Sequence, residues 1–258
     1  MLKILKKLGS RFVKWSISSH ECQFNHLKYC FFRKNTSKVL LVVFSGFPGK
    51  GNAARYNYVR TLSGIKANKL FLLDDIENPV NTGSYYLGKD GDWYLAKDVV
   101  QLIAKIVKEN DIQKVITLGS SKGGTSALLF GLKTEADACI IGAPQYYIGD
   151  YLFAEEHRPI LEMIMGDVSS ESVVKLNNLV KDEIFRKHSK KLTVYIHYSP
   201  NEHTYQDHIC DMIRDLRQAG YSVNEDNGYH YTKHSEVANH FPKYLRARVK
   251  DCIDNNQA

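Results

Sequence analysis

The chain has few cysteines, and their spacing excludes a disulfide framework and a structural zinc site. Its 258 residues include five cysteines, an odd and widely spaced set without a Cys-x-x-Cys pair. Disulfide-stapled domains and structural zinc sites need paired or clustered cysteines. We therefore expect reduced thiols in a cytoplasmic protein that binds no metal. The five are Cys22, Cys30, Cys139, Cys210 and Cys252.

Long apolar runs are also missing. In residues 1–20, Leu5, Leu8, Phe12 and Trp15 recur at helical spacing, but basic residues interrupt every apolar stretch. A signal peptide or a membrane-spanning helix needs a longer uninterrupted run. We expect instead a basic amphipathic helix. It either packs on a protein surface or lies peripherally on the inner face of the membrane.

The charge is unbalanced towards the positive, with a formal net charge of +7. Such a charge favours acidic partners, namely a polyanionic glycan, a phosphorylated cofactor or anionic lipid. Nucleic acid is not expected as a partner, because no nucleic-acid-binding motif is present. The content of 43% hydrophobic and 24% charged residues is that of an ordinary globular protein, and the length suits one domain.

Strand-like and helix-like patterns alternate along the chain after a predicted edge hairpin at residues 22–34. Strands are predicted at residues 39–44, 70–73, 115–118, 138–141, 192–198 and, more weakly, 221–223. Helices are predicted at residues 53–62, 93–108, 124–132, 205–218 and 235–250. Continuous apolar strands separated by helices indicate an α/β domain over residues 21–258, with a mostly parallel sheet and helices on both faces.

One stretch interrupts this alternation. Residues 146–190 carry helical stripes but no convincing strand. A connection of this length is usually a functional insertion. We predict a helical lid here, and the alternative is a set of helices that only pack on the core.

The most specific motif is Gly-Ser-Ser-Lys-Gly at residues 119–123, between an apolar strand and a helix rich in small residues. A strand followed by G-x-S-x-G and a helix is the nucleophile elbow of the α/β-hydrolase fold. Neither this segment nor residues 46–51 has the order of a phosphate-binding P-loop. Ser121 is therefore the predicted nucleophile.

A second motif supports the elbow. Ser-Gly-Phe-Pro-Gly at residues 45–49 follows the strand at 39–44. In α/β hydrolases this loop lends one backbone N–H to the oxyanion hole, and the residue after the nucleophile lends the other. The predicted donors are thus Phe47 and Lys122.

A serine nucleophile needs a base, and the base needs a carboxylate that orients it. In this fold the chain order is serine, acid, histidine. Glu202 follows the strand at 192–198 and is the predicted acid, with Asp207 in reserve. The predicted base is His234, directly before the last helix, and His230 is the second choice.

The same segments resemble those of bacterial capsular-polysaccharide O-acetyltransferases of the α/β-hydrolase type and, more distantly, glycan-acetylating proteins of accessory secretion systems. The resemblance lies in residues 44–48, 56–58, 83–86, 118–124 and 143–145, and in the C-terminal histidine. It implies Ser121 as nucleophile, Glu202 as acid and His234 as base. The acid is a departure, because the capsule enzymes are associated with aspartate at this position.

The resemblance implies a serine-dependent O-acetyltransferase. It would move acetyl from acetyl-CoA, its donor substrate, through an acyl-enzyme on Ser121 to a hydroxyl of a capsular or other surface polysaccharide. No other cofactor is expected. The same triad serves hydrolysis, so a carboxylesterase or deacetylase is one alternative. A non-catalytic glycan-binding or assembly protein is another.

Overall fold

The computed structural model describes residues 19–49, 52–76, 83–189 and 192–254. Residues 1–18, where the basic amphipathic helix is predicted, lie outside the described residues. In the described part of the chain, no helix is long and apolar enough to cross a membrane.

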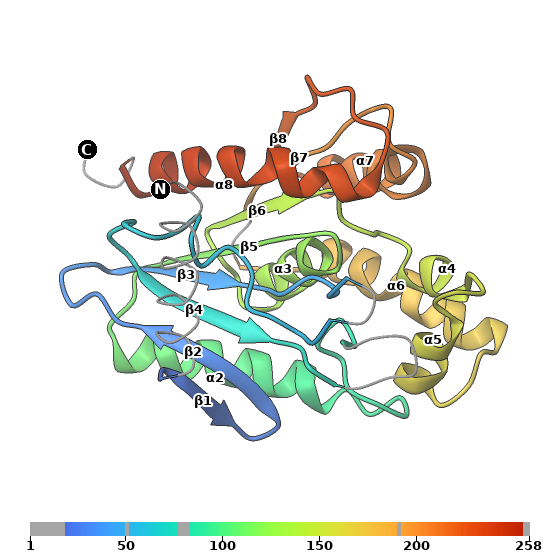
Figure 1. The fold of residues 1–258 in the computed structure, drawn as a ribbon, viewed down its shortest axis with the longest axis horizontal. Coiled ribbons are helices and arrows are strands. Elements are labelled where there is room, and N and C mark those ends of the chain that lie inside the picture. The colour runs from blue at the N-terminus through green and yellow to red at the C-terminus, as the bar shows by residue number, and fades with distance from the viewer. Residues whose placement is uncertain (1–18, 50–51, 77–82, 190–191, 255–258) are drawn as a thin grey trace, which may run out of the picture.

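A single eight-stranded sheet forms the centre of the molecule (Figure 1). Its strand order is β1-β2-β4-β3-β5-β6-β7-β8. The hairpin of β1 and β2 is antiparallel and β2 is antiparallel to β4, whereas every other neighbouring pair is parallel. The strands are β1 (Glu21–Phe24), β2 (Leu27–Phe32), β3 (Val39–Val43), β4 (Asn68–Leu73), β5 (Lys114–Ser120), β6 (Ala138–Gly142), β7 (Thr193–His197) and β8 (Ser222–Asp226).

The strands are linked largely through helices, as a parallel sheet requires. The helices are α2 (Tyr94–Glu109), α3 (Lys122–Lys133), α4 (Ile148–Phe153), α5 (Arg158–Met165), α6 (Ser170–Phe185), α7 (Cys210–Gln218) and α8 (Val237–Asp254). A π-helical turn, Tyr205–Ile209, leads into α7, and a 3-10 turn, His234–Glu236, leads into α8.

Helices α3 and α8 cover opposite faces of the sheet. A Cβ atom on Gly131 of α3 would lie 2.6 Å from Thr117 Oγ1 in β5. Thr117 is the register partner of Cys139 in β6, so both side chains point towards α3. Gly142 is three residues beyond Cys139 and faces the other way. There the ring of Phe241 in α8 packs on it.

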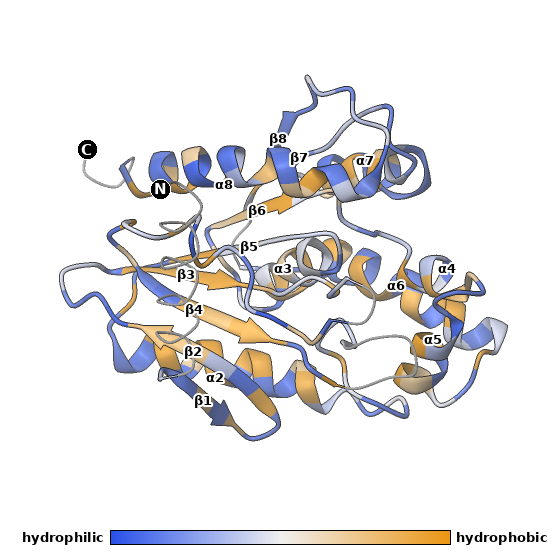
Figure 2. Cartoon of the chain, viewed as in Figure 1, coloured by the Kyte–Doolittle hydropathy of each residue, from blue (hydrophilic) through white to orange (hydrophobic). Residues whose placement is uncertain are grey.

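The core lies between these layers. Every residue of β3 and β6 is buried, so both strands are continuous apolar runs rather than alternating ones. Figure 2 shows hydrophobic residues along the central strands, whereas α2 alternates between a hydrophobic and a hydrophilic side. The predicted α/β class with a mostly parallel sheet is confirmed.

The predicted helix at residues 53–62 is wrong. The described part of this segment is irregular, with a turn near residues 59–64, and Tyr58 adopts a left-handed φ of 59°. Its polar side chains are hydrogen-bonded to distant segments of the chain: Asn57 Oδ1 accepts the N–H of Gly46 at 3.2 Å, and Tyr58 OH lies 2.5 Å from Ser120 Oγ. These tertiary bonds override a weak local preference for helix.

The predicted insertion at residues 146–190 contains α4, α5 and α6, at the end of the sheet where β3, β4 and β6 point (Figure 1). Helices α4 and α6 approach closely, because a Cβ on Gly149 would lie 2.1 Å from the backbone oxygen of Val173. Whether this insertion acts as a lid stays a prediction.

Packing between α8 and the sheet generates a stability prediction. In Gly142→Ala the new methyl group would stand 2.7 Å from the Phe241 ring, and overpacking of this kind costs about 1–3 kcal/mol. In the control, Gly228→Ala, the methyl group meets nothing within 4 Å. Urea unfolding should show a lower midpoint for Gly142→Ala alone. Equal midpoints would contradict this packing.

Candidate active site

Ser121 sits on a sharp turn between β5 and α3. Its φ of 54° and ψ of −131° are unfavourable for a residue with a side chain. The turn is fastened on both sides, since Ser121 N–H donates to Gly142 O at 2.8 Å and Ser121 O accepts Gly124 N–H at 2.8 Å. A Cβ on Gly119 would lie 2.2 Å from the backbone oxygen of Gly123. The small residues of the motif are therefore a steric requirement of the elbow.

The imidazole of His234 lies directly against this serine. His234 Nε2 is 2.8 Å from Ser121 Oγ, although 113 residues separate the two in sequence. The loop that leads to His234 is held by Ser199, two residues beyond the end of β7. The Ser199 hydroxyl lies 2.7 Å from Tyr231 O and 3.0 Å from Tyr229 O. The loop that carries His234 is thus anchored beside the end of β7.

Glu202 completes a serine–histidine–carboxylate arrangement. Its Oε1 lies 3.3 Å from His234 Nδ1, an ion-pair distance that is not a well-directed hydrogen bond. Such contacts are often long before substrate binds. The carboxylate is fully buried and accepts hydrogen bonds from the hydroxyl and the N–H of Thr204. Burial alone would raise the pKa of Glu202, but the close approach of His234 and the hydrogen bonds from Thr204 together outweigh burial and lower the pKa.

The two reserve residues of the sequence are not part of this arrangement. Asp207 is exposed and lies 3.1 Å from His203 Nδ1. His230 is exposed in the loop after β8, four residues before His234. His203 itself approaches Glu202, with Nε2 3.3 Å from Oε1. The geometry therefore brings together Ser121, His234 and Glu202.

The loop after β3 leaves the backbone N–H of Phe47 available. Ser45 N–H donates to Tyr86 OH at 2.8 Å, and Gly46 N–H donates to Asn57 Oδ1 at 3.2 Å. The next N–H, that of Phe47, has no acceptor among the described residues. Lys122 N–H belongs to the first turn of α3, where helical N–H groups lack intrahelical partners. Both predicted oxyanion donors are thus uncommitted.

The side chain of Lys122 does not reach solvent. It is 0% exposed and forms an ion pair with the equally buried Asp74, at 2.7 Å between Nζ and Oδ2. Its ammonium also lies 5.2 Å from the ring centre of Phe47 and 5.0 Å from that of Tyr86. Burial lowers the pKa of Lys122, and Asp74 partly opposes this shift. Lys122 thereby connects the elbow to the loop after β3.

Sequence reasoning assigned no role to Asp74, Asn57 or Gln145. Gln145 follows β6, and its Nε2 donates to Ser121 Oγ at 2.9 Å. Asn57 and Gln145 lie in segments that carried the family resemblance, which was the available signal. For Asp74 the sequence offered no such signal beyond its position at the end of a predicted strand.

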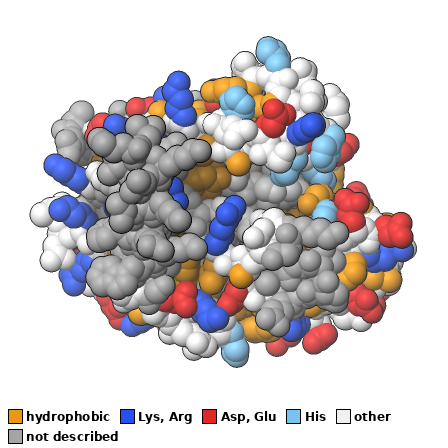
Figure 3. Space-filling model, in the orientation of Figure 1, with side chains coloured by type: hydrophobic (Ala, Val, Ile, Leu, Met, Phe, Trp, Pro, Cys, Tyr) orange, Lys and Arg blue, Asp and Glu red, His pale blue; other side chains and the backbone are white. Residues whose placement is uncertain are grey.

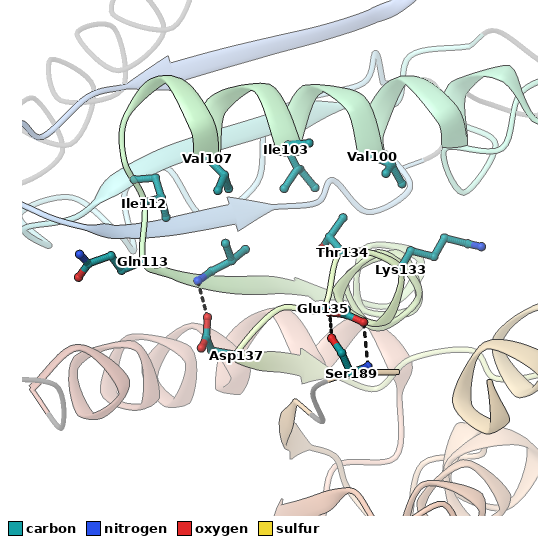
Figure 4. A pocket seen from close by; sticks show the side chains of 12 residues that line it. Val100, Ile103, Val107, Ile112, Gln113, Lys133, Thr134, Glu135, Asp137 and Ser189 are labelled. Atoms are coloured by element: carbon teal, nitrogen blue, oxygen red, sulfur yellow. Dashed lines mark hydrogen bonds between the residues drawn. The ribbon is translucent and has the colours of Figure 1, made fainter. Parts of the chain in front are cut away.

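The space-filling view shows a hollow near the centre of one face, with hydrophobic side chains inside it and a basic side chain beside it (Figure 3). A separate cavity of about 620 Å³ lies between α2 and the starts of β5 and β6 (Figure 4). Those strand starts are the opposite end of the sheet from Ser121, so that cavity is no part of this site.

The described residues contain no group of three or more His, Cys, Asp or Glu side chains that could hold a metal ion.

A serine on a strand–turn–helix elbow at the end of a mostly parallel sheet defines the α/β-hydrolase fold. Solved structures bear this out. The capsule O-acetyltransferase of Neisseria meningitidis serogroup A superposes with a TM-score of 0.76 and 22% identity, over 89% of this chain and 93% of that one. A variant of that enzyme, in complex with CoA, matches similarly, with a TM-score of 0.74 and 21% identity over 89% of this chain and 94% of that one.

Two further structures widen the comparison. The glycosylation-associated protein complex of Streptococcus agalactiae matches with a TM-score of 0.73 and 19% identity, over 89% of this chain and 44% of that one. The fluorophosphonate-binding serine hydrolase F of Staphylococcus aureus matches with a TM-score of 0.59 and 16% identity, over 88% of this chain and 91% of that one. No family model and no curated protein matches the chain. The resemblance indicated by the motifs is confirmed at the level of the fold.

The environment of Glu202 predicts how stability depends on pH. Because its pKa in the folded protein is below the ordinary value of 4.5, its bonds stabilise the fold fully above that pH, and the stabilisation is lost as pH falls through the folded pKa. Urea unfolding of the wild type and Glu202→Gln between about pH 6 and about pH 3 measures this. The difference between the two proteins should shrink at acid pH. A constant difference would contradict an ionised, hydrogen-bonded Glu202.

Proposed function

We propose that this protein is a serine-dependent O-acetyltransferase that transfers acetyl from acetyl-CoA to a hydroxyl of a bacterial capsular or other surface polysaccharide. One observation carries the proposal: the imidazole of His234 lies between the serine and the acid, with Nε2 2.8 Å from Ser121 Oγ and Nδ1 3.3 Å from Glu202 Oε1. In serine enzymes a histidine and a carboxylate arranged in this way activate the serine as a nucleophile, which supports acyl transfer. The fold shared with a capsule O-acetyltransferase supports the choice of donor and acceptor.

In the first half-reaction, Ser121 Oγ attacks the carbonyl carbon of the thioester. Its proton passes to His234 Nε2, and Glu202 holds the imidazolium that forms. The oxyanion of the tetrahedral intermediate accepts hydrogen bonds from the backbone N–H groups of Phe47 and Lys122. The carbon–sulfur bond then breaks, the proton goes to the departing sulfur, and acetyl remains on Ser121.

In the second half-reaction, a sugar hydroxyl replaces the thiol. His234 takes the proton of that hydroxyl as its oxygen attacks the acetyl-serine, and the same N–H groups hold the second oxyanion. Collapse breaks the bond from the acetyl carbon to Oγ and returns the proton to Ser121. The products are an acetylated sugar and the free enzyme.

The net charge of the chain and the basic residues of its N-terminal segment indicate the partners. A net charge of +7 suits an anionic donor and a polyanionic glycan acceptor. We propose that the protein is cytoplasmic and that residues 1–20 contact the inner membrane face or the capsule-assembly machinery. We propose that helices α4 to α6, which lie at the carboxyl end of the sheet, cover the acyl-serine and exclude water.

A carboxylesterase or deacetylase is the second candidate. It is favoured by the likeness to the serine hydrolase of Staphylococcus aureus, which shares the fold. The two candidates need the same triad and differ in what attacks the acyl-enzyme.

The triad generates a prediction on activity. Ser121→Ala should fold normally and lower turnover by roughly a thousandfold or more, as the loss of a triad nucleophile does. Glu202→Ala and His234→Ala should also be severely impaired, whereas Asp207→Ala and His230→Ala, whose side chains lie outside the arrangement, should stay active. An inactive His230→Ala beside an active His234→Ala would show that the base is misassigned.

A second prediction separates transfer from hydrolysis. With acetyl-CoA alone the protein should release thiol slowly. A suitable capsular polysaccharide should accelerate release, and the recovered polymer should carry acetyl groups, because the sugar hydroxyl resolves the acyl-enzyme faster than excluded water. Thiol titration and proton NMR of the polymer measure both. Fast hydrolysis of small acyl esters, with no acetyl on any polymer tested, would favour the esterase.

A further inference from the structure

The hydroxyl of Ser121 has a second partner besides the imidazole. Gln145 Nε2 lies 2.9 Å from Ser121 Oγ, and His234 Nε2 lies 2.8 Å from the same atom. A serine hydroxyl has one hydrogen to donate and two lone pairs. An N–H from Gln145 occupies one lone pair, so the hydroxyl hydrogen is left for His234.

The amide of Gln145 is held in place by buried groups. Gln145 is fully buried, and its backbone N–H and C=O each lie 2.9 Å from Thr125 Oγ1 in α3. Its Oε1 faces Tyr85 OH at 3.4 Å. Because the tyrosine hydroxyl can donate to Oε1, the amide is oriented with Nε2 towards Ser121.

Strained backbone supports this orientation. Tyr85 has a φ of 55° and Ala143, two residues before Gln145, has a φ of 39°. Residues with side chains avoid this region, and such strain persists where the surroundings impose it, often at functional sites. Tyr85 is itself fully buried, and its turn is fastened by the N–H of Ser84 on Asp74 at 2.7 Å.

We propose that Gln145 is a catalytic residue that orients the nucleophile. Its side-chain N–H fixes Ser121 Oγ so that the hydroxyl hydrogen points at His234 and the free lone pair at the incoming carbonyl carbon. It also stabilises the negative charge that develops on Oγ whenever that atom is the leaving group. This inference rests on the proposed role of Ser121 and applies to transfer and to hydrolysis alike.

Phosphonylation by a fluorophosphonate probe tests the proposal without acetyl-CoA or glycan. The probe forms a bond from Oγ to phosphorus, fluoride leaves, and the serine proton passes to His234. Gln145→Leu keeps the side chain's bulk and removes the donor. We expect it to lower the second-order rate of labelling by about tenfold, the effect of one net hydrogen bond. Gln101→Leu, on the exposed side of α2, controls for the substitution itself and should label at the wild-type rate.

A second variant covers the case in which Gln145→Leu fails to fold. Gln145→Glu preserves shape and the acceptor for Tyr85, but its carboxylate cannot donate to Oγ. Its labelling rate relative to the wild type should be low at neutral pH and should rise as pH falls, because a protonated carboxyl regains a donor. A defect in packing alone would leave this ratio independent of pH.

The outcomes are distinguishable. Labelling of folded Gln145→Leu within twofold of the wild type, or a pH-independent ratio for Gln145→Glu, would overturn the role of Gln145 and leave the proposed function intact. A wild-type protein that the probe does not label at Ser121 would contradict the proposed nucleophile, and with it this inference.

Discussion

The carboxylate of Asp74 carries a negative charge into the core at the end of β4, and the site is organised around it. A buried charge is tolerated only when it is paired and hydrogen-bonded. Asp74 meets this condition with Lys122 Nζ at 2.7 Å and with the N–H groups of Ser84 at 2.7 Å and Tyr86 at 3.0 Å. One carboxylate therefore joins Lys122, the residue after Ser121, to the turn at residues 83–87.

The consequences of this pair reach each part of the site. Tyr86, fixed by its N–H, presents its hydroxyl to Ser45 N–H and to Leu72 O. Asn57 accepts a hydrogen bond from the next N–H of the same loop, that of Gly46, and the N–H of Phe47 after it stays available. Neighbouring Tyr85 faces Gln145. The groups that we propose as the oxyanion hole and as the orienting amide are thus positioned before any substrate binds, which is how such donors become effective.

The sequence predicted those features that depend on local pattern. Apolar strands and the elbow at Ser121 follow from short-range chemistry, and the structure has a strand at each predicted strand segment. The serine–acid–histidine order came instead from the chain order known for this fold. The sequence ranked His234 above His230 but kept both, because the distance of each histidine from Ser121 depends on how their shared loop is anchored, here by Ser199. Asp74 and Gln145 were missed since their partners lie 48 and 24 residues away. The helix predicted at 53–62 was wrong because tertiary bonds from Asn57 and Tyr58 replaced it.

Acyl transfer through Ser121 is the central claim, and hydrolysis is its nearest rival, because a single triad serves both. The most direct measurement is the intact mass of the protein after brief exposure to acetyl-CoA without acceptor. The account predicts that the wild type gains the mass of one acetyl group, that peptide mapping locates it on Ser121, and that Ser121→Ala gains nothing. Acetylation of both proteins at other residues, or a wild type that consumes acetyl-CoA without Ser121 becoming acetylated, would contradict it.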